Sequence, residues 1–174
     1  MGKRSNFKRV ERDFYPTPIE AVKPLIPHLP SDFTYWEPCA GDGALVCHLV
    51  ALNPGIWCAL RSDISPVHIC IKKQNALPCE IPKCDYIISN PPWSVHLLHP
   101  MIERFSARAP TWLLFYADWM HTKQSAPYMK WCRKIVSVGR VKWIPDSKMT
   151  GKDNAAWYLF DQSKNGPTEF VGRT

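Results

Sequence analysis

The residues best suited to chemistry stand together in one short stretch, Asn90, Pro91, Pro92 and Trp93. They follow residues 86–88, an apolar, β-branched and aromatic run that is typical of a buried strand. Because proline has no backbone N–H, the ladder hydrogen bonds of that strand must stop at this point. The sequence therefore predicts a strand whose carboxyl end presents an amide, a rigid carbonyl and an indole.

These groups suit the recognition of an amine on a flat ring. The Asn90 side-chain oxygen and the Pro91 carbonyl can both accept hydrogen bonds from an exocyclic amino group, and Trp93 can stack on its ring. The lone pair of such an amine is delocalised, so fixed acceptors would stabilise the positive charge that develops on nitrogen as it reacts. The alternative is a plain turn after a strand, with Trp93 in the core.

A glycine-rich turn lies upstream, between a predicted strand and a predicted helix. Residues 34–37 are typical of a strand and residues 44–50 of a helix, and the turn between them contains Gly41 and Gly43. Glycines let a backbone approach a ligand closely, so this arrangement indicates a nucleotide-type binding corner. It lacks the Gly-Lys-Ser/Thr of a Walker loop and the complete Gly-x-Gly-x-x-Gly dinucleotide pattern.

An acidic residue follows the next predicted strand, residues 56–60. Asp63 stands about 20 residues beyond Gly43, the separation that a ribose-binding carboxylate has from a glycine corner. The sequence therefore predicts that Asp63 grips ribose hydroxyls.

Strands and helices alternate along most of the chain. Apolar residues recur at helical spacing over 97–105, and further strands are predicted at 112–116, 134–143 and 155–160. This alternation implies a parallel sheet with right-handed crossovers. The expected fold is α/β, with a Rossmann-like, seven-stranded, mostly parallel sheet, a C-terminal antiparallel hairpin and helices on both faces.

Three local features are less regular. Thr17 is expected to cap a helix over 19–26, which Pro24 should shorten or kink. Residues 67–71 are expected to form a short connecting helix, and residues 74–77 a very short third strand.

Size and composition fit one domain over residues 14–174, since 174 residues with 45% hydrophobic content can build a full core. No apolar run approaches the roughly 20 residues of a membrane span. Seven scattered cysteines indicate a reducing compartment, so a cytoplasmic protein is expected. No second Cys/His pair follows Cys79 and Cys84 at a distance suitable for zinc, so no metal site is expected.

The charge favours a polyanionic partner, with a net value of +7 and a pI near 9.1. Residues 1–13 are predicted to be a basic arm, either a solvated tail or a contact for phosphates. Of the eight tryptophans several adjoin lysine or arginine, such as Trp143 beside Lys142. Mixed aromatic and cationic side chains can hold unpaired or flipped bases, although core packing explains most single tryptophans.

Together these motifs resemble class I S-adenosylmethionine-dependent methyltransferases, specifically the amino-methyltransferases that carry Asn/Asp-Pro-Pro-aromatic. The matching segments occur in the family's order over roughly the first half of the chain: residues 14–18, 37–43, 63, 75–77 and 90–93. The compact size and the Phe-Tyr-Pro-Thr-Pro opening are similar to small methyltransferases often found in phages and prophages. Such proteins are commonly assigned to adenine-N6 methylation of DNA.

The resemblance implies S-adenosylmethionine as the cofactor. Glu37 and the glycine turn would hold its methionine part, Asp63 the ribose and Ile64 the adenine ring. Asn75 departs from the family, which often has an acidic residue there for the adenine amine. The implied catalytic residues are Asn90, Pro91, Pro92 and Trp93. The implied cofactor-binding residues are Tyr15, Thr17, Pro18, Glu37, Pro38, Ala40, Gly41, Gly43, Asp63, Ile64, Asn75 and Asn90.

The predicted reaction is methyl transfer to the adenine N6 amine in DNA, with the base flipped out because stacking shields that amine in a duplex. Other acceptors stay open, namely an RNA base, cytosine N4 or a protein glutamine amide. So does a cofactor-binding or nucleic-acid-binding protein without turnover. No separate target-recognition domain fits the chain, so loops such as 121–131 and 145–153 would contact the substrate.

Overall fold

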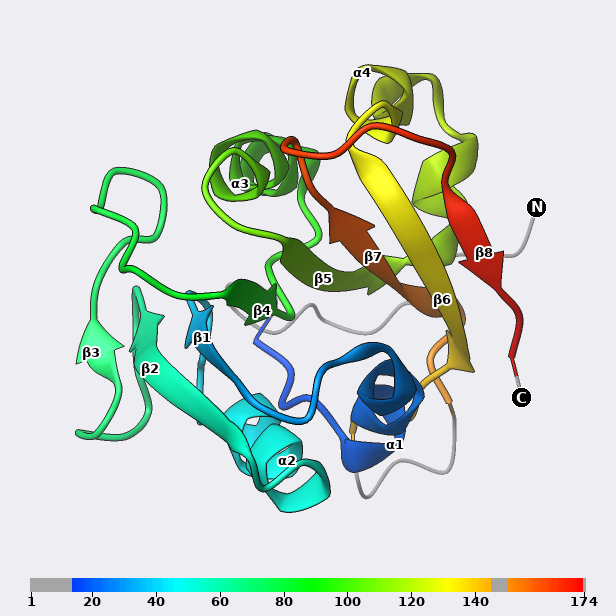
Figure 1. Cartoon of the computed structure of the whole chain (residues 1–174). Helices are drawn as coiled ribbons and strands as arrows, with labels where there is room; N and C mark the ends of the chain where they lie inside the picture. Colours follow the sequence, from blue (N-terminus) through cyan, green and yellow to red (C-terminus); the bar gives the residue numbers. More distant parts are fainter. Residues whose placement is uncertain (1–13, 145–149, 174) are drawn as a thin grey trace.

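The computed structural model describes residues 14–144 and 150–173, so the predicted basic arm lies outside the described residues. Its centre is an eight-stranded sheet in the order β3-β2-β1-β4-β5-β7-β6-β8 (Figure 1). The strands are β1 Phe33–Glu37, β2 Ile56–Asp63, β3 Lys72–Lys73, β4 Tyr86–Ser89, β5 Thr111–Tyr116, β6 Cys132–Arg140, β7 Asn154–Phe160 and β8 Glu169–Val171.

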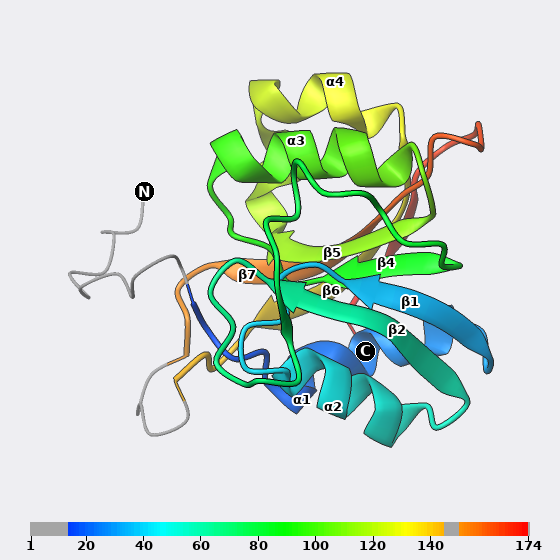
Figure 2. The ribbon, with the colours of Figure 1, turned by 90° about the vertical axis from the view of Figure 1, so that its left-hand side faces the viewer.

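Helices cover both faces of this sheet. Figure 2 shows α1 (Ile19–Val22) and α2 (Ala44–Leu52) on one face, and α3 (Val95–Ser106) and α4 (Ala126–Met129) on the other. Short 3-10 helices complete the described helical segments: η2 Lys23–His28, η3 Ala117–His121 and η4 Lys123–Ser125. The chain thus forms a three-layer α/β fold, as the alternation of strands and helices predicts.

Strand β5 places apolar side chains on both faces of the sheet, so both faces must pack against helices. Its side chains alternate across the sheet, so Trp112 and Leu114 join the core under α1 and α2, while Leu113 and Phe115 join the core under α3. Helix α3 supplies a matching apolar stripe at i, i+3, i+4 and i+7, formed by Leu98, Met101, Ile102 and Phe105. Four tryptophans are almost fully buried in these layers, so core packing accounts for Trp36, Trp112, Trp119 and Trp157.

The strand order reverses between β1 and β4. Strand β1 pairs in parallel with β2 on one side and with β4 on the other. The chain therefore leaves β1 toward β2 and β3, and then returns to the opposite side of β1. Open α/β sheets bind ligands at such a reversal, beyond the carboxyl ends of the strands. In this chain those ends are Glu37 and Ser89.

The predicted fold class is confirmed, including the antiparallel pairing of β6 with β7. The strand count is eight rather than seven because β8 adds in parallel to β6. Strand β8 has three residues, too few for a periodic pattern, and its Glu169 is paired with Lys134 at 2.9 Å. Contacts across the sheet therefore define it.

Two further predictions between β2 and β4 are wrong. Residues 67–71 form turns and bends instead of a helix: the Val67 N–H bonds to the Gly41 carbonyl at 3.0 Å, and the Ile71 N–H closes a turn onto the His68 carbonyl at 3.0 Å. The third strand is Lys72–Lys73 instead of 74–77, and it pairs with Ser62 and Asp63 at the end of β2. Near the N-terminus the effect of Pro24 is confirmed, as α1 ends at Val22 and continues as 3-10 helix.

Candidate functional site

The glycine turn after β1 has the backbone that only glycine adopts easily. Gly41 has φ of 55° and Gly43 φ of 85°, both in the left-handed region. A Cβ on Gly41 would lie 2.6 Å from Cε2 of Phe14, so the Phe14 ring packs directly on this turn. The residues Ala40, Gly41 and Gly43 are buried. The turn is therefore a tight backbone corner with an aromatic ring against it.

Asp63 ties the end of β2 to this corner. Its Oδ2 accepts a hydrogen bond from the Gly41 N–H at 2.9 Å, and its Oδ1 accepts one from the Ser65 N–H at 2.7 Å. Each carboxylate oxygen keeps a second lone pair. Asp63 therefore orders the turn and can still accept hydrogen bonds from a ligand hydroxyl.

Glu37, at the end of β1, is fully buried, and only one of its two carboxylate oxygens accepts hydrogen bonds from the described residues. Its Oε1 accepts hydrogen bonds from the Ser89 hydroxyl at 2.6 Å and the Cys39 N–H at 3.3 Å, whereas Oε2 has no partner among the described residues. Burial raises the pKa of Glu37 to about 8 despite the opposing hydrogen bonds from Ser89 and Cys39, and the charge of Asp63 adds to the rise. A buried carboxylate with one free oxygen is well suited to a cationic donor.

The Asn90 amide, directly after β4, is bonded at both ends. Its Nδ2 donates to the Thr17 hydroxyl at 3.1 Å, and its Oδ1 accepts from Nε1 of Trp93 at 3.3 Å. An indole N–H can only donate, so the amide atom that faces it must be the oxygen. The prediction that Thr17 caps α1 is wrong, because Pro18 occupies the cap position and makes no side-chain cap bond.

The Trp93 side chain packs against other aromatic side chains. Its N–H also donates to the Leu114 carbonyl at 3.2 Å, and its ring is partly buried against both cores. The ring centroids of Trp143 and Tyr116 lie 5.6 and 6.0 Å from that of Trp93. Neither residue is among the predicted site residues. Tyr116 ends β5, and Trp143 follows β6, so their place after strands is the signal that could have indicated them.

The remaining predicted residues differ in their exposure. Ile64 is 55% exposed just after β2, and Asn75 is exposed with its Oδ1 bound to the Leu77 N–H at 3.2 Å. The buried prolines are Pro38 and Pro91, and the partly buried residues are Tyr15, Pro18 and Pro92. Hydrogen bonds thus link Gly41 to Asp63 in one group and Thr17 to Trp93 through Asn90 in another. They connect Asn75 to neither group.

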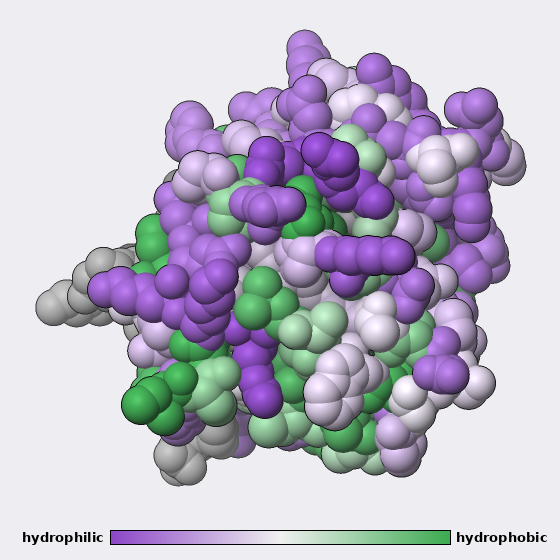
Figure 3. Space-filling model, turned by 60° about the vertical axis from the view of Figure 1, so that its left-hand side comes forward, coloured by the Kyte–Doolittle hydropathy of each residue, from purple (hydrophilic) through white to green (hydrophobic). Residues whose placement is uncertain are grey.

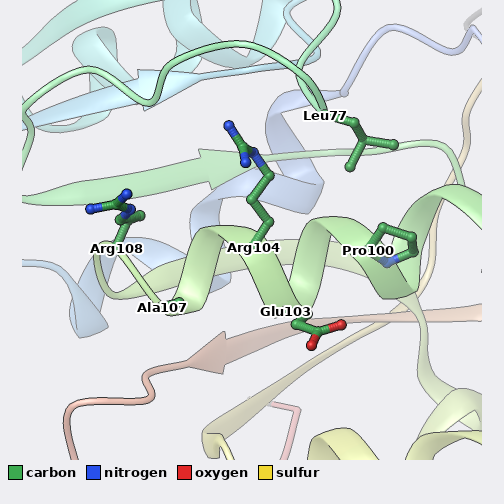
Figure 4. Close-up of a pocket in the computed structure, with 6 residues that line it drawn as sticks. All are labelled: Leu77, Pro100, Glu103, Arg104, Ala107 and Arg108. Atoms are coloured by element: carbon green, nitrogen blue, oxygen red, sulfur yellow. The ribbon is translucent and has the colours of Figure 1, made fainter.

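The open hollow drawn in Figure 4 lies elsewhere, on the flank of α3. Arg104 and Arg108 point to the same side of this helix, and Glu103 points away from them. The Arg104 guanidinium donates to the Cys79 carbonyl, so it holds the segment before β4 against α3. Its buried Nε cannot reach a ligand. Arg104 is therefore held by the protein itself at this hollow.

Exposed apolar side chains of the described residues include Ile64, Val67 and Ile69, between β2 and β3. On the face shown in Figure 3, apolar residues form small patches among polar ones. Over residues 14–144 and 150–173, no group of three or more His, Cys, Asp or Glu side chains could hold a metal ion. In these same ranges no helix has the length and apolar character needed to cross a membrane.

No protein-family model and no curated protein sequence matches the chain. Solved structures do match it. A dimethyladenosine transferase from Plasmodium falciparum has a TM-score of 0.56 and 16% identity, and the match covers 86% of this chain and 63% of that one. A protein assigned as an RNA methyltransferase from Pyrococcus horikoshii has a TM-score of 0.57 and 16% identity, with coverage of 91% and 92%. The third is assigned as a modification subunit of a type I restriction enzyme from Vibrio vulnificus YJ016, with a TM-score of 0.62, 12% identity and coverage of 92% and 47%.

The chain has the class I methyltransferase fold. The likeness to methyltransferase structures extends over most of this chain, while the chain spans only 63% and 47% of the Plasmodium and Vibrio proteins. At 12 to 16% identity the likeness concerns the fold alone. In this methyltransferase fold, the glycine turn and Asn90 both lie at the carboxyl edge where the strand order reverses.

Proposed function

We propose that this chain binds S-adenosylmethionine and transfers its methyl group to an exocyclic amine of a nucleic-acid base, with adenine N6 in DNA as the main acceptor. The observation that carries the proposal is the Asn90 amide, which is held by hydrogen bonds at both its nitrogen and its oxygen. The preceding residue, Ser89, donates its hydroxyl to the buried Glu37 carboxylate. An amine-recognition group and a cation-binding group are thereby neighbours at the ligand-binding edge of a methyltransferase fold.

The residues at the glycine turn fit the cofactor. The free Oε2 of Glu37 is a buried acceptor for the ammonium group of the methionine part. The tight left-handed turn at Gly41 and Gly43 would pack against the methionine part, and the spare lone pairs of Asp63 suit ribose hydroxyls. Exposed Ile64 would cover the adenine ring. Tyr15, Thr17, Pro18, Pro38, Ala40 and Asn75 stay assigned to the cofactor as predictions.

When bound, S-adenosylmethionine supplies an electrophilic methyl group on a sulfonium. The protein's part is to hold the acceptor amine. Oδ1 of Asn90 and the carbonyl oxygen of Pro91 would accept hydrogen bonds from the two N–H groups of this amine. These acceptors would stabilise the positive charge that develops on nitrogen. Thr17 and Trp93 keep the Asn90 amide from rotating. The proton can leave after nitrogen becomes cationic, so no general base is assigned.

A flipped base would lie among aromatic side chains. Trp93, Tyr116 and Trp143 form one group beside Asn90, and Pro92 stays assigned to this part of the site as a prediction. Aromatic faces hold flipped bases by stacking. The net charge of +7 suits a nucleic acid better than a protein acceptor. The Phe-Tyr-Pro-Thr-Pro segment at residues 14–18 supports a phage-type DNA enzyme.

Adenine in RNA is the second candidate. The Plasmodium neighbour is a dimethyladenosine transferase and the Pyrococcus neighbour is assigned to RNA, whereas the Vibrio neighbour is assigned to a restriction enzyme. Cytosine N4, a protein glutamine amide and binding without turnover are further outcomes of the same assay. The free thiols of all seven cysteines fit a reducing compartment, so we propose a cytoplasmic location.

The test is methyl transfer from labelled cofactor to duplex DNA, single-stranded DNA, RNA and a protein extract. Mass spectrometry of the nucleosides then identifies the modified base. We expect N6-methyldeoxyadenosine with the native protein and none with Asn90→Ala. Label in ribonucleosides alone would favour the RNA acceptor, and cofactor binding without any transfer would contradict an enzyme.

A further inference from the structure

The Ser89 hydroxyl links the last residues of two neighbouring strands. Ser89 ends β4 and Glu37 ends β1, and these strands pair in parallel. Both residues are 0% exposed, and the 2.6 Å between Ser89 Oγ and Glu37 Oε1 is the usual length of a charge-assisted hydroxyl–carboxylate hydrogen bond. The Cys39 N–H donates to the same oxygen. Both donors therefore act on Oε1, and Oε2 is left without a partner in the described chain.

We propose that Ser89 is a positioning residue whose hydroxyl fixes the Glu37 carboxylate, so that Oε2 stays free for the ammonium group of the cofactor. This inference rests on the proposed function. Without the hydroxyl, the Cys39 N–H at 3.3 Å would be the only described donor to the carboxylate. The side chain could then rotate, and its charged form would lose its stronger donor.

The charges around Glu37 determine how this positioning can be measured. The titratable groups that face it are Tyr35 on β1, Cys39 in the turn, and Cys58 and Asp63 on β2. Burial raises the pKa of the Tyr35 hydroxyl and of both thiols, so these groups are neutral near pH 7. Glu37 is then the facing group that gains or loses a proton there.

Cofactor binding should consequently release a proton. Burial raises the pKa of Glu37 to about 8, so the ligand-free carboxyl is mostly protonated at pH 7, whereas an ammonium group binds the carboxylate. Below this pKa, affinity should rise roughly tenfold per pH unit. Ser89 donates to the carboxylate and lowers this pKa, so loss of its hydroxyl should raise the pKa further and move the affinity curve to higher pH.

The experiment is calorimetric titration with S-adenosylhomocysteine from pH 5.5 to 7.5, where the ligand's own amine stays charged. Two buffers of different ionisation enthalpy report the protons released. We expect the native protein to release close to one proton at pH 6.5, and Ser89→Ala to bind roughly tenfold more weakly at pH 7 with its curve moved to higher pH. Ser89→Thr keeps the hydroxyl and should restore the native curve.

A ligand control separates positioning from general damage. An S-adenosylhomocysteine analogue without the amino group should bind the native protein and Ser89→Ala alike, with no proton release. Ser89→Ala with the native affinity and pH profile would overturn the inference alone, as would pH-independent binding by the native protein. No binding of S-adenosylhomocysteine to the native protein would overturn the proposed function itself. Calorimetry of the native protein tests the predicted proton release by itself, even where a variant does not fold.

Discussion

The Asn90 amide donates from Nδ2 to the Thr17 hydroxyl at 3.1 Å, although 73 positions separate the two residues in the chain. Thr17 is 5% exposed, and the Trp93 indole holds the other end of the same amide. The acceptor oxygen is therefore oriented before any ligand arrives. Fixed groups of this kind stabilise developing charge without reorganising during the reaction.

Asn90→Ala should abolish detectable methyl transfer, because losing the fixed acceptor lowers the rate by roughly 10²–10³-fold. Cofactor affinity should stay within a few-fold, since the cation-binding carboxylate of Glu37 is untouched. Transfer is measured with labelled cofactor, and affinity by calorimetry with S-adenosylhomocysteine.

Asp63→Ala should have the reverse effect and weaken cofactor binding first. It removes the acceptor for the Gly41 N–H as well as the proposed ribose contact, so the dissociation constant should rise about 10- to 100-fold. The rate at saturating cofactor should change little. An equal loss of cofactor affinity in Asn90→Ala and Asp63→Ala would contradict the division of roles between the two residues.

Trp93→Phe keeps an aromatic ring but removes the N–H that bonds to Asn90 and to the Leu114 carbonyl. We expect roughly tenfold slower transfer, because the amide oxygen is less well held. Trp57→Phe is the matched control, since Trp57 is 70% exposed and far along the sheet on β2. Native activity in Trp93→Phe would mean that the indole N–H does not orient Asn90.

Gly41→Ala should lower the free energy of unfolding by about 1–2 kcal/mol, because its φ of 55° is unfavourable for alanine. The added Cβ would also meet the Phe14 ring at 2.6 Å and displace it. Phe14→Ala in the same chain should remove that second effect, as urea titrations of the single and double variants can show. Gly172→Ala is the control, because a Cβ added at Gly172 would have no neighbouring atom within 4 Å. It should leave the free energy of unfolding nearly unchanged.

The ligand-free protein should become less stable as pH rises from about 5 to 8.5. Burial raises the pKa of Glu37 from 4.5 to about 8, so the folded state binds more protons than the unfolded state between these values. This contribution to stability is fully present below pH 4.5 and is lost as the pH rises from there through 8, by an amount on the order of 5 kcal/mol. Unfolding free energies at pH 5, 6.5 and 8.5 measure this slope. Glu37→Gln cannot titrate and should flatten it; an unchanged slope would assign the effect to other groups.

Removing residues 1–12 should weaken nucleic-acid binding mainly at low salt, because basic side chains displace counterions from phosphates. Binding isotherms at several salt concentrations give the affinity and its salt slope. If both stay the same, the basic arm is only a solvated tail.

Local patterns were sufficient for most elements of the sheet. Residues 112–116 and 155–160 were predicted as strands, and the structure has Thr111–Tyr116 and Asn154–Phe160. The end of β4 before Asn90 was predictable because proline cannot donate to a ladder, and the glycine turn because Gly41 and Gly43 tolerate positive φ. Strand β8 and the turns at 67–71 were not, since partners distant in the chain define them.

The sequence by itself determined which groups stand at strand ends, because backbone chemistry of proline and glycine acts within a few residues. Only the tertiary structure decided their partners. Ser89 reaches Glu37 across 52 positions and Gly41 reaches Asp63 across 22, because β1 lies between β2 and β4 in the sheet. Strand order depends on packing both faces of the sheet under helices, which no local pattern encodes. For that reason Thr17, expected at a helix cap, is instead the partner of Asn90.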